Sequence, residues 1–395
     1  MLELLAALAI MLVVTAGVVV LVGASEDAFA AESEAADMQQ RLRVAAGALF
    51  KDVVMAGAGV YHGERSGSLA YYFAPVLPFR QGTGTDDPPG TFKTDTITLM
   101  YVPTTFAQAR LATVGPSGTT GTVAVESSPG CPLGDPVCGF EKGMSVILFD
   151  GSGTYDRFEI RGVGPGSIGL EHTGPVLTFA GFQPLRTTIV QVKNVTYYLK
   201  SAPSTDTYQL MSSSGGTGVD VPVLDHLVSL KFDYYGDPDP PRLTGVPLSD
   251  PRGPWTTYGP APPERGKQIP TGGYPEGENC TFSVDALTGS QVPRLPVLSG
   301  GATPTALVPL TSAQLDGTDG GPWCPDPVSA NRWDADLLRV RSIGVTIRVE
   351  SANAALRGPA GVLFTHGGTS TRAARWLPDQ EVTFRVTPRN LNLGR

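Results

Sequence analysis

The 395-residue chain has few charged residues and few residues of the types that most often do chemistry. Asp, Glu, Lys and Arg together make up 17% of it, against 41% apolar residues, so it is not the charge-rich, core-poor kind of chain that stays disordered. Only four residues are His and four are Cys. The net charge of −8 argues against a general nucleic-acid binder, whose affinity depends on neutralising phosphates.

The sequence also lacks the common motifs of catalytic and nucleotide sites. It contains no Gly-x-Ser-x-Gly, His-Glu-x-x-His or phosphate-binding loop. Residues 164–169 have the spacing Gly-x-Gly-x-x-Gly, but a strand-like segment follows where a nucleotide site needs a helix. We therefore expect a turn there and predict no catalytic residue, no cofactor and no enzymatic activity. The four His are widely separated: His62, His172, His226 and His366.

Gly and Pro, by contrast, are in excess, with 48 and 35 residues and no period of three. This excludes collagen and nearly excludes an all-helical protein, because these residues form helices worst. No helical period of useful length returns after about residue 61, which favours an antiparallel sheet over parallel βαβ units. Asp150-Gly151-Ser152-Gly153 is typical of a hairpin turn. Strand candidates cover residues 96–102, 146–149, 156–160, 188–199, 208–211, 227–235, 339–350 and 381–387.

The first 60 residues have a different pattern. Residues 4–25 carry no charge, and as a helix they would measure about 33 Å, enough to cross a bilayer core. We therefore predict one long helix: its first half, residues 1–25, lies in lipid or a filament core, and its second half, residues 26–60, packs on a head. An apolar stripe at steps of three and four marks that second half: Met38, Leu42, Ala45, Leu49, Val53 and Ala56.

Three interpretations of this N-terminus compete. A cleaved secretory signal would have basic residues in front and a shorter apolar core, although an Ala-x-Ala site does exist at residues 28–30. A plain signal anchor also lacks the flanking basic residues that set orientation. Neither accounts for Glu3, because a carboxylate at the start of a membrane helix is costly unless it meets a cation.

The third interpretation is a resemblance. The segment Met-Leu-Glu-Leu-Leu-Ala-Ala-Leu-Ala-Ile-Met, residues 1–11, resembles the start of mature type IV pilins and pseudopilins. In that family a basic leader ending in Gly precedes a Phe, and a Glu soon after it pairs with the N-terminal amine of a neighbouring subunit. Glu3 matches this Glu but stands third rather than fifth, and the leader and the Phe are absent. We expect the sequence to begin at an internal Met, two residues into the mature protein.

Three further patches resemble large minor pilins of the PilW type: residues 41–57, 94–99 and 386–391. The resemblance implies an α+β, pilin-like fold with one long N-terminal helix and a large antiparallel β-rich extracytoplasmic head, residues 61–395. It implies a structural subunit of a type IV pilus, partnered by other pilin subunits, the prepilin peptidase and the assembly machinery. The chain would then lie in the bacterial inner membrane and afterwards in the extracellular pilus.

Because a head of more than 300 residues is bulky to repeat at every lattice position, we favour a minor pilin at or near the tip that helps to start assembly or contacts a surface. An unusually large major pilin and a minor pseudopilin of a type II secretion system are alternatives in the same class. A membrane-anchored extracytoplasmic enzyme and a secreted adhesin are alternatives from other classes.

Within the apolar first half of the predicted helix, Gly17 and Gly23 are predicted to be weak points of the helical structure. Gly17 lies among β-branched residues, which like Gly are poor helix formers in water. Either the helix loosens here when subunits assemble, or these residues stay helical because they lie in lipid.

In the head, Pro and Gly saturate residues 236–278 and 299–330, which predicts an irregular surface insertion over residues 236–336. The four cysteines allow three pairings, of which Cys131–Cys138 with Cys280–Cys324 is the simplest. A zinc site is disfavoured, because the spacings are wrong and no His lies near either pair, so we predict no metal ligands. Disulfides imply an extracytoplasmic head.

Two groups of acids could supply oxygen ligands to calcium. Asp233, Asp237 and Asp239 form one group, and Asp150 and Asp156 form the other. Neither has the ligand count or the acidic closing residue of a calcium loop, so turn formation is the favoured interpretation.

Two more patterns bear on partners. Asn194 and Asn279 begin sequons for N-glycosylation. Residues 332–395 hold ten Arg against five acids, a basic segment that could contact DNA or an anionic surface. The favoured interpretation is that these Arg are solvated on strand faces and pair with acids elsewhere, so nucleic acid is not expected as a partner.

Overall fold

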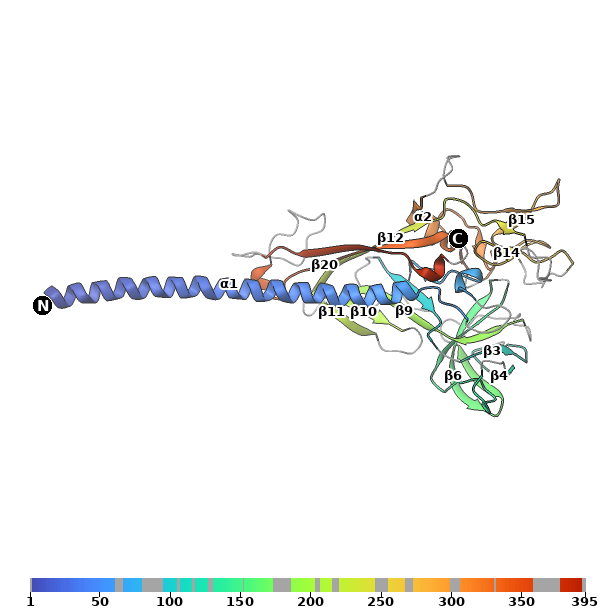
Figure 1. The fold of residues 1–395 in the computed structure, drawn as a ribbon, viewed down its shortest axis with the longest axis horizontal. Helices are drawn as coiled ribbons and strands as arrows, with labels where there is room; N and C mark the ends of the chain where they lie inside the picture. Colours follow the sequence, from blue (N-terminus) through green and yellow to red (C-terminus); the bar gives the residue numbers. More distant parts are fainter. Residues whose placement is uncertain are drawn as a thin grey trace.

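The protein consists of one long helix followed by a β-rich head (Figure 1). Every pairing between its named strands is antiparallel. The predicted α+β class, with an antiparallel β-rich domain after an apolar helix, is therefore confirmed. The computed structural model describes residues 2–60, 67–79, 95–104, 107–115, 118–126, 131–151, 153–172, 186–202, 207–214, 220–245, 255–266, 273–298, 306–329, 332–357 and 377–392.

Helix α1 spans Leu2–Met55, 54 residues without a proline. It ends where Gly57 takes a φ of +77° and donates its N–H to the carbonyl of Met100, 3.0 Å away. A Cβ at Gly57 would lie 2.7 Å from Leu391, so the close return of the C-terminal segment also requires glycine here. The end of the helix therefore has two physical causes, one conformational and one steric.

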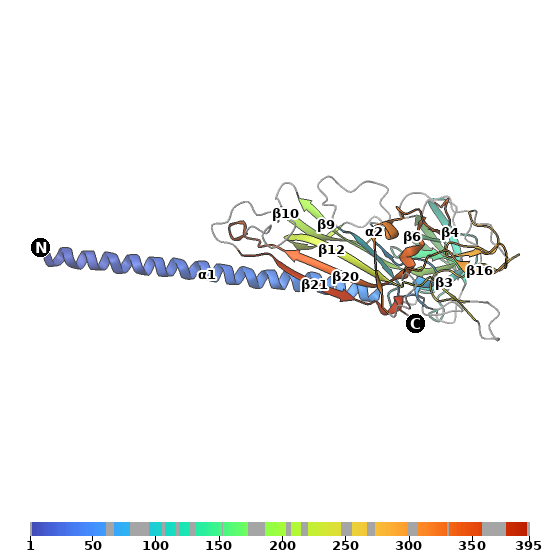
Figure 2. The same cartoon turned by 90° about the horizontal axis from the view of Figure 1, so that it is seen from above.

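Two sheets pack against the second half of α1 and run along it (Figure 2). Their strand orders are β1-β2-β9-β10-β11 and β17-β12-β20-β21. The first sheet contains β1 (Val76–Leu77), β2 (Ile97–Tyr101), β9 (Lys193–Ala202), β10 (Thr207–Ser213) and β11 (Val221–Asp225). The second contains β12 (Leu227–Gly236), β17 (Val308–Leu310), β20 (Val340–Val349) and β21 (Gln380–Val386).

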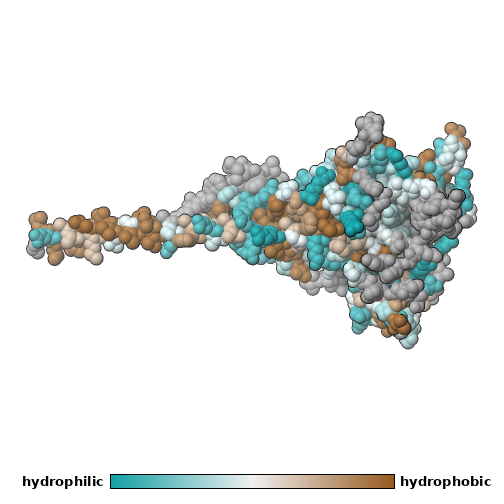
Figure 3. Space-filling model, viewed as in Figure 1, coloured by the Kyte–Doolittle hydropathy of each residue, from teal (hydrophilic) through white to brown (hydrophobic). Residues whose placement is uncertain are grey.

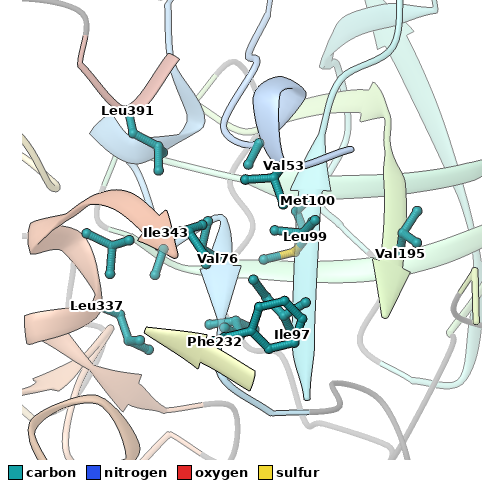
Figure 4. Packing of buried hydrophobic residues seen from close by; sticks show 14 of the residues in the cluster. Val53, Val76, Ile97, Leu99, Met100, Val195, Phe232, Leu337, Ile343 and Leu391 are labelled. Atoms are coloured by element: carbon teal, nitrogen blue, oxygen red, sulfur yellow. The ribbon is translucent and has the colours of Figure 1, made fainter. Parts of the chain in front are cut away.

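The main core lies between α1 and these sheets. Val53 of α1 lies beside Leu99 and Met100 of β2 in this core, with Phe232 and Ile343 from the second sheet nearby (Figure 4). Burial of such a side chain contributes about 1.5–3 kcal/mol at most. The whole apolar stripe predicted for the second half of the helix is buried: Met38, Leu42, Ala45, Leu49, Val53 and Ala56.

A closed barrel forms a second unit of the head and has its own core. It lies beyond the end of α1, at the lower right of Figure 1. The predicted hairpin at residue 150 joins two of its strands, with Phe149 opposite Tyr155. The barrel strands are β3 (Gln108–Leu111), β4 (Thr120–Glu126), β5 (Ser145–Phe149), β6 (Tyr155–Gly164), β7 (Ser167–His172) and β8 (Thr188–Gln191).

The strand candidate at residues 188–199 is divided in the structure. Its first part is β8 of the barrel, and its second part is β9 of the five-stranded sheet. The division falls at Val192, which is buried and donates its N–H to Ser145. Because the sequence is apolar across this division, its pattern does not show where the barrel strand ends and the strand of the five-stranded sheet begins.

Residues 236–336 contain more regular structure than the predicted irregular insertion. Their described part packs onto the main core, where Tyr258, Leu295 and Leu315 are buried, and β17 joins the four-stranded sheet. The other elements are β13 (Leu243–Thr244), β14 (Trp255–Thr256), β15 (Phe282–Val284), β16 (Gln291–Pro293), α2 (Ser312–Asp316), β18 (Trp323–Cys324) and β19 (Trp333–Asp334). Short 3₁₀ turns cover Leu69–Tyr71, Ala335–Arg339, Ala354–Leu356 and Arg389–Leu391.

Candidate membrane and assembly interface

The first 21 residues of α1 form a rod that projects from the head, and all of its large apolar side chains are exposed. Figure 3 shows the largely apolar surface of one face of this rod. The exposed fraction of its large side chains runs from 48% at Val22 to 85% at Leu2. By length and composition this helix is able to cross a membrane. So large an apolar surface is unstable in water, and it must be covered by lipid or by other protein.

The site residues predicted on the rod lie in regular helix. Glu3 is exposed in the first turn of α1 and is the only charged side chain of the rod. Gly17 and Gly23 do not interrupt the helix, and a Cβ at either position would meet nothing within 4 Å. In the single chain the rod is therefore a continuous helix, without a break at either predicted weak point.

A buried carboxylate joins the end of α1 to the first sheet. Asp52 is 4% exposed and accepts hydrogen bonds at 2.7 Å from the hydroxyls of Tyr101 on β2 and Tyr197 on β9. The ammonium of Lys193 lies 3.2 Å from the same carboxylate. This cluster was not predicted, because its members are far apart in the chain.

The electrostatics of this cluster follow from its burial. Burial raises the pKa of Tyr101 and of Tyr197, and the bonds to Asp52 add to the shift, so both hydroxyls stay protonated donors. Burial opposes the charge on Lys193, but its contacts with Tyr101 and Asp52 leave its pKa raised, so the amine stays charged. The carboxyl oxygens of Asp52 thus accept from three donors on two strands, which ties the end of α1 to the first sheet.

A second connection lies closer to the rod. Arg41 pairs with Asp37 at 2.7 Å and with Glu34 at 3.0 Å on its own helix. It also donates to the carbonyl of Glu350 at 3.0 Å, while Glu34 accepts the N–H of Ala352 at 2.5 Å. The two connections together attach the second half of α1 to the first sheet and to the segment that follows β20.

The cysteines pair as predicted, Cys131 with Cys138 and Cys280 with Cys324, at Cα separations of 4.4 and 5.0 Å. The first pair closes a short loop against the barrel core, and the second joins two segments that pack on the main core. Both pairs therefore reinforce the head at a distance from the rod.

The acids considered as calcium ligands are not brought together. Lys231, Arg242 and Arg341 each neutralise one of the first three, at distances of 2.7, 3.0 and 2.7 Å. These pairs are Asp233–Lys231, Asp239–Arg242 and Asp237–Arg341. Over the described ranges no cluster of three or more His, Cys, Asp or Glu is arranged to hold a metal ion.

The other acid pair has separate roles in the barrel. Asp150 donates its N–H to the carbonyl of Thr154 in the hairpin, 3.1 Å away. Asp156 lies 2.8 Å from the Nε2 of His172, and both side chains are buried. Burial is the main cause that raises the pKa of Asp156, and the contact with His172 opposes the shift. This acid–imidazole pair was not predicted, and it joins neighbouring strands inside the barrel wall.

Of the remaining His, only His226 lies in the described part of the chain. His226 is at the turn between β11 and β12, where it has a φ of +58° and contacts Arg357 at 3.1 Å. Burial and this guanidinium lower its pKa. His62 and His366 lie outside the described residues.

Four arginines of the C-terminal segment are buried rather than solvated, which corrects the favoured interpretation of that segment. Their exposed fractions are at most 7%, so these four offer no surface to an anionic partner. Arg372, Arg375 and Arg395 lie outside the described residues. As expected, each of the four pairs with an acid: Arg339–Asp336, Arg341–Asp237, Arg348–Asp379 and Arg357–Glu350.

The Gly-rich motif and the two sequons are all placed by the structure. The Gly-rich segment 164–169 is the turn between β6 and β7, as predicted, with Gly166 at a φ of +72°. Asn194 is 4% exposed on β9, and Asn279 is 6% exposed and donates to the carbonyl of Pro260. Neither sequon presents its amide at the surface of the folded head.

The barrel has a shallow open depression of about 490 Å³ over β4, β6 and β7. Its polar lining includes Thr120, Thr122, Ser167 and Arg161, and Arg161 pairs with Glu171 at 3.4 Å. Among the described residues no His, Cys or Asp lines it, so they supply no acid–base pair of the kind that nucleophilic catalysis uses.

Comparison with known proteins adds no relative: no family model, curated protein or solved structure matches the chain. Function is therefore argued from the geometry of the chain itself.

Proposed function

We propose that the chain is a structural subunit of a type IV pilus or a related filament. The observation that carries this proposal is an exposed apolar rod that continues, as one helix, into a second half bound to a large disulfide-bonded head. A plain membrane anchor needs no rigid connection to its head. A subunit that passes from lipid into a bundle of parallel helices does need one, because the position of its rod then determines the position of its head.

Glu3 supports the same function. It is the only charge on the apolar rod, and a carboxylate in an apolar surrounding is stable only beside a cation. In a bundle of such rods the N-terminal amine of a neighbouring subunit supplies that cation. The inner membrane holds the subunit before assembly, and the extracellular filament holds it afterwards.

Within the filament we place the subunit at or near the tip, as a minor pilin that helps to start assembly or contacts a surface. The head consists of two sheets, a barrel and the packed segment 236–336, and so broad a head hinders close repetition at every lattice position. A minor pseudopilin of a secretion system shares the same rod and remains the alternative within this class.

The test substitutes Glu3→Ala in the full chain in its native host and compares it with Glu26→Ala, an exposed acid just beyond the apolar rod. We expect both variants to enter the membrane at wild-type levels. Filaments sheared from the cells and immunoblotted should contain wild type and Glu26→Ala, but at least tenfold less Glu3→Ala. Absence of the wild-type chain from filaments, or normal incorporation of Glu3→Ala, would contradict the proposal.

A further inference from the structure

The ring of His226 is bound to an arginine at the point where the two sheets of the head are joined. His226 forms the turn between β11 and β12, and its Nδ1 lies 3.1 Å from Nη2 of Arg357. A guanidinium has only donors, so Nδ1 has to accept this bond as an unprotonated nitrogen. A proton on Nδ1 would remove the acceptor and place a second cation beside the first. The contact therefore exists only with a neutral imidazole.

Arg357 in turn holds the short segment that follows β20. We call residues 350–352 the neck segment, because it lies beside α1 at the end of the head nearest the rod (Figure 1). All three nitrogens of the guanidinium reach it. Nε lies 2.6 Å from the carbonyl of Ser351, Nη2 lies 3.1 Å from that of Ala352, and Nη1 lies 3.5 Å from the carboxylate of Glu350.

Helix α1 binds the neck segment from the other side. The contacts are those of Arg41 with the carbonyl of Glu350 and of Glu34 with the N–H of Ala352. The N–H of Glu350 is held by the carbonyl of His226, 3.0 Å away. The neck segment is thus fixed between α1 and a guanidinium whose place depends on the protonation of one imidazole.

Charged groups from several elements surround His226. Arg357 and, from α1, Arg41 disfavour a charge on its ring, whereas Glu350 after β20 and Asp225 in its own turn favour one. Burial is the largest cause, and together with the two arginines it outweighs the acids and lowers the pKa of His226 from its usual 6.5. The imidazole is therefore neutral at pH 7.5 and takes up a proton only below pH 6.5.

One further acid beside the neck segment titrates in a similar range. Asp379 lies 3.4 Å from Arg348, and burial raises its pKa to about 6. The folded chain binds this proton more tightly than the unfolded chain does, so the titration of Asp379 stabilises the fold as the pH falls. Its effect is opposite in sign to that of His226, which the experiment has to separate from it.

We propose that His226 and Arg357 form an acid-sensitive clasp, which holds the neck segment and the adjoining part of α1 against the head at neutral pH and releases them in acid. When the imidazole is protonated, the bond at 3.1 Å is lost and the two cations move apart. Arg357 then leaves the carbonyls of the neck segment. The clasp does not depend on the filament function proposed above.

The connection at Asp52 does not share this sensitivity. The pKa values of its donors Tyr101, Tyr197 and Lys193 are all raised, so these groups keep their protons between about pH 5 and 8. In acid α1 therefore keeps its contacts near residue 52 and loses those of Arg41. The head is then able to tilt on the helix without unfolding.

Hydrogen exchange followed by mass spectrometry tests the clasp on the full chain in detergent. We compare pH 7.5 with pH 5 after correction for the intrinsic pH dependence of exchange. Peptides over residues 350–357 of the wild type should lose at least tenfold in protection at pH 5. Peptides from β2 and β9, which contact Asp52, should change less than twofold.

Two variants assign the effect to the imidazole. His226→Asn tolerates the positive φ, offers Arg357 an acceptor oxygen and takes up no proton, so its protection should be equal at both pH values. His226→Lys carries a charge throughout and should lose the protection already at pH 7.5. Unchanged protection of the wild type in acid would overturn the clasp. An equal loss in His226→Asn would also overturn it, because Asp379 titrates in that variant as well.

Spin labels test the release of α1 independently. The labels are attached at Glu32→Cys on α1 and Lys231→Cys on β12, both exposed, and the native cysteines do not compete because all four are in disulfides. The distribution of distances between the labels should broaden at pH 5 and stay narrow when His226→Asn is added. A distribution of constant width would overturn the release, whereas absence of the chain from filaments would contradict only the proposed function.

Discussion

Asp334 is a buried residue whose ionisation we expect to change the stability of the head. It is 1% exposed and caps the 3₁₀ turn Ala335–Arg339 by accepting the N–H of Asp336 at 2.8 Å. Its second oxygen has no hydrogen-bond partner in the described part of the chain. Burial raises the pKa of Asp334 to about 7, and the nearby carboxyl of Asp336 adds to the shift.

This raised pKa predicts a pH dependence of stability. Above about pH 4 the unfolded chain releases a proton that the folded chain retains at Asp334, so stability falls as the pH rises toward 7 and then levels off. Asp334→Asn keeps the cap and removes the charge. We expect its thermal midpoint at pH 8 to exceed that of the wild type by about 2–4 °C, roughly 1 kcal/mol, with little difference at pH 4. Equal midpoints at both pH values would contradict this account.

The predictability of single residues depended on whether their role was local. Gly57 and the hairpin at residue 150 were predictable, because stops and turns are set by neighbouring residues. Asp52 and the buried Arg339 were not. Each has partners more than 40 residues away in the chain. Nothing in the neighbouring sequence distinguishes these charged residues from charged residues at the surface.

At the scale of elements, the junction between α1 and the first sheet depends on the Asp52 cluster. Asp52→Ala would leave the hydroxyls of Tyr101 and Tyr197 without their acceptor, since both now donate to it at 2.7 Å. We expect the head to lose about 2–4 kcal/mol of unfolding free energy, measured by denaturant titration in detergent. Asp52→Asn retains one acceptor oxygen and should lose less.

Asp37→Ala provides the matched control for this junction. Its side chain is 53% exposed and its partner Arg41 keeps two other contacts, so we expect a loss below about 1 kcal/mol. A loss at Asp52 as small as that at Asp37 would show that the cluster does not stabilise the junction.

The elements themselves were predicted with uneven success. The helix and its buried stripe follow from a 3.6-residue period that is visible in the sequence. The closure of β3 to β8 into a barrel was not predicted, because closure depends on which strands pair, and pairing of distant strands leaves little trace in either one. The order within residues 236–336 was missed for a related reason: short strands among Pro and Gly are ordered by packing on the core.

At the scale of the whole molecule, the rod contributes no buried residue to the core of the head. Buried residues of α1 begin at Met38, and the rod before residue 23 is exposed throughout. Deletion of residues 1–25 should therefore release the head from membranes into the soluble fraction. It should also leave the thermal midpoint of the head equal to that of the full chain in detergent.

Fractionation by ultracentrifugation, followed by thermal unfolding of the soluble material, checks both parts of this prediction. A deleted chain that still sediments with membranes would show that the head itself binds lipid. A lowered midpoint would show that the rod stabilises the head through contacts that the single chain does not contain.

The sequence by itself determined the division of this protein into an apolar rod and a disulfide-bonded antiparallel head, because hydrophobic periodicity, Gly and Pro content and cysteine spacing act locally. Only the tertiary structure decided which charges are buried at the junction, how the barrel closes and which helix face remains outside. These outcomes depend on contacts between residues distant in the chain, and such contacts form only when the whole core is assembled.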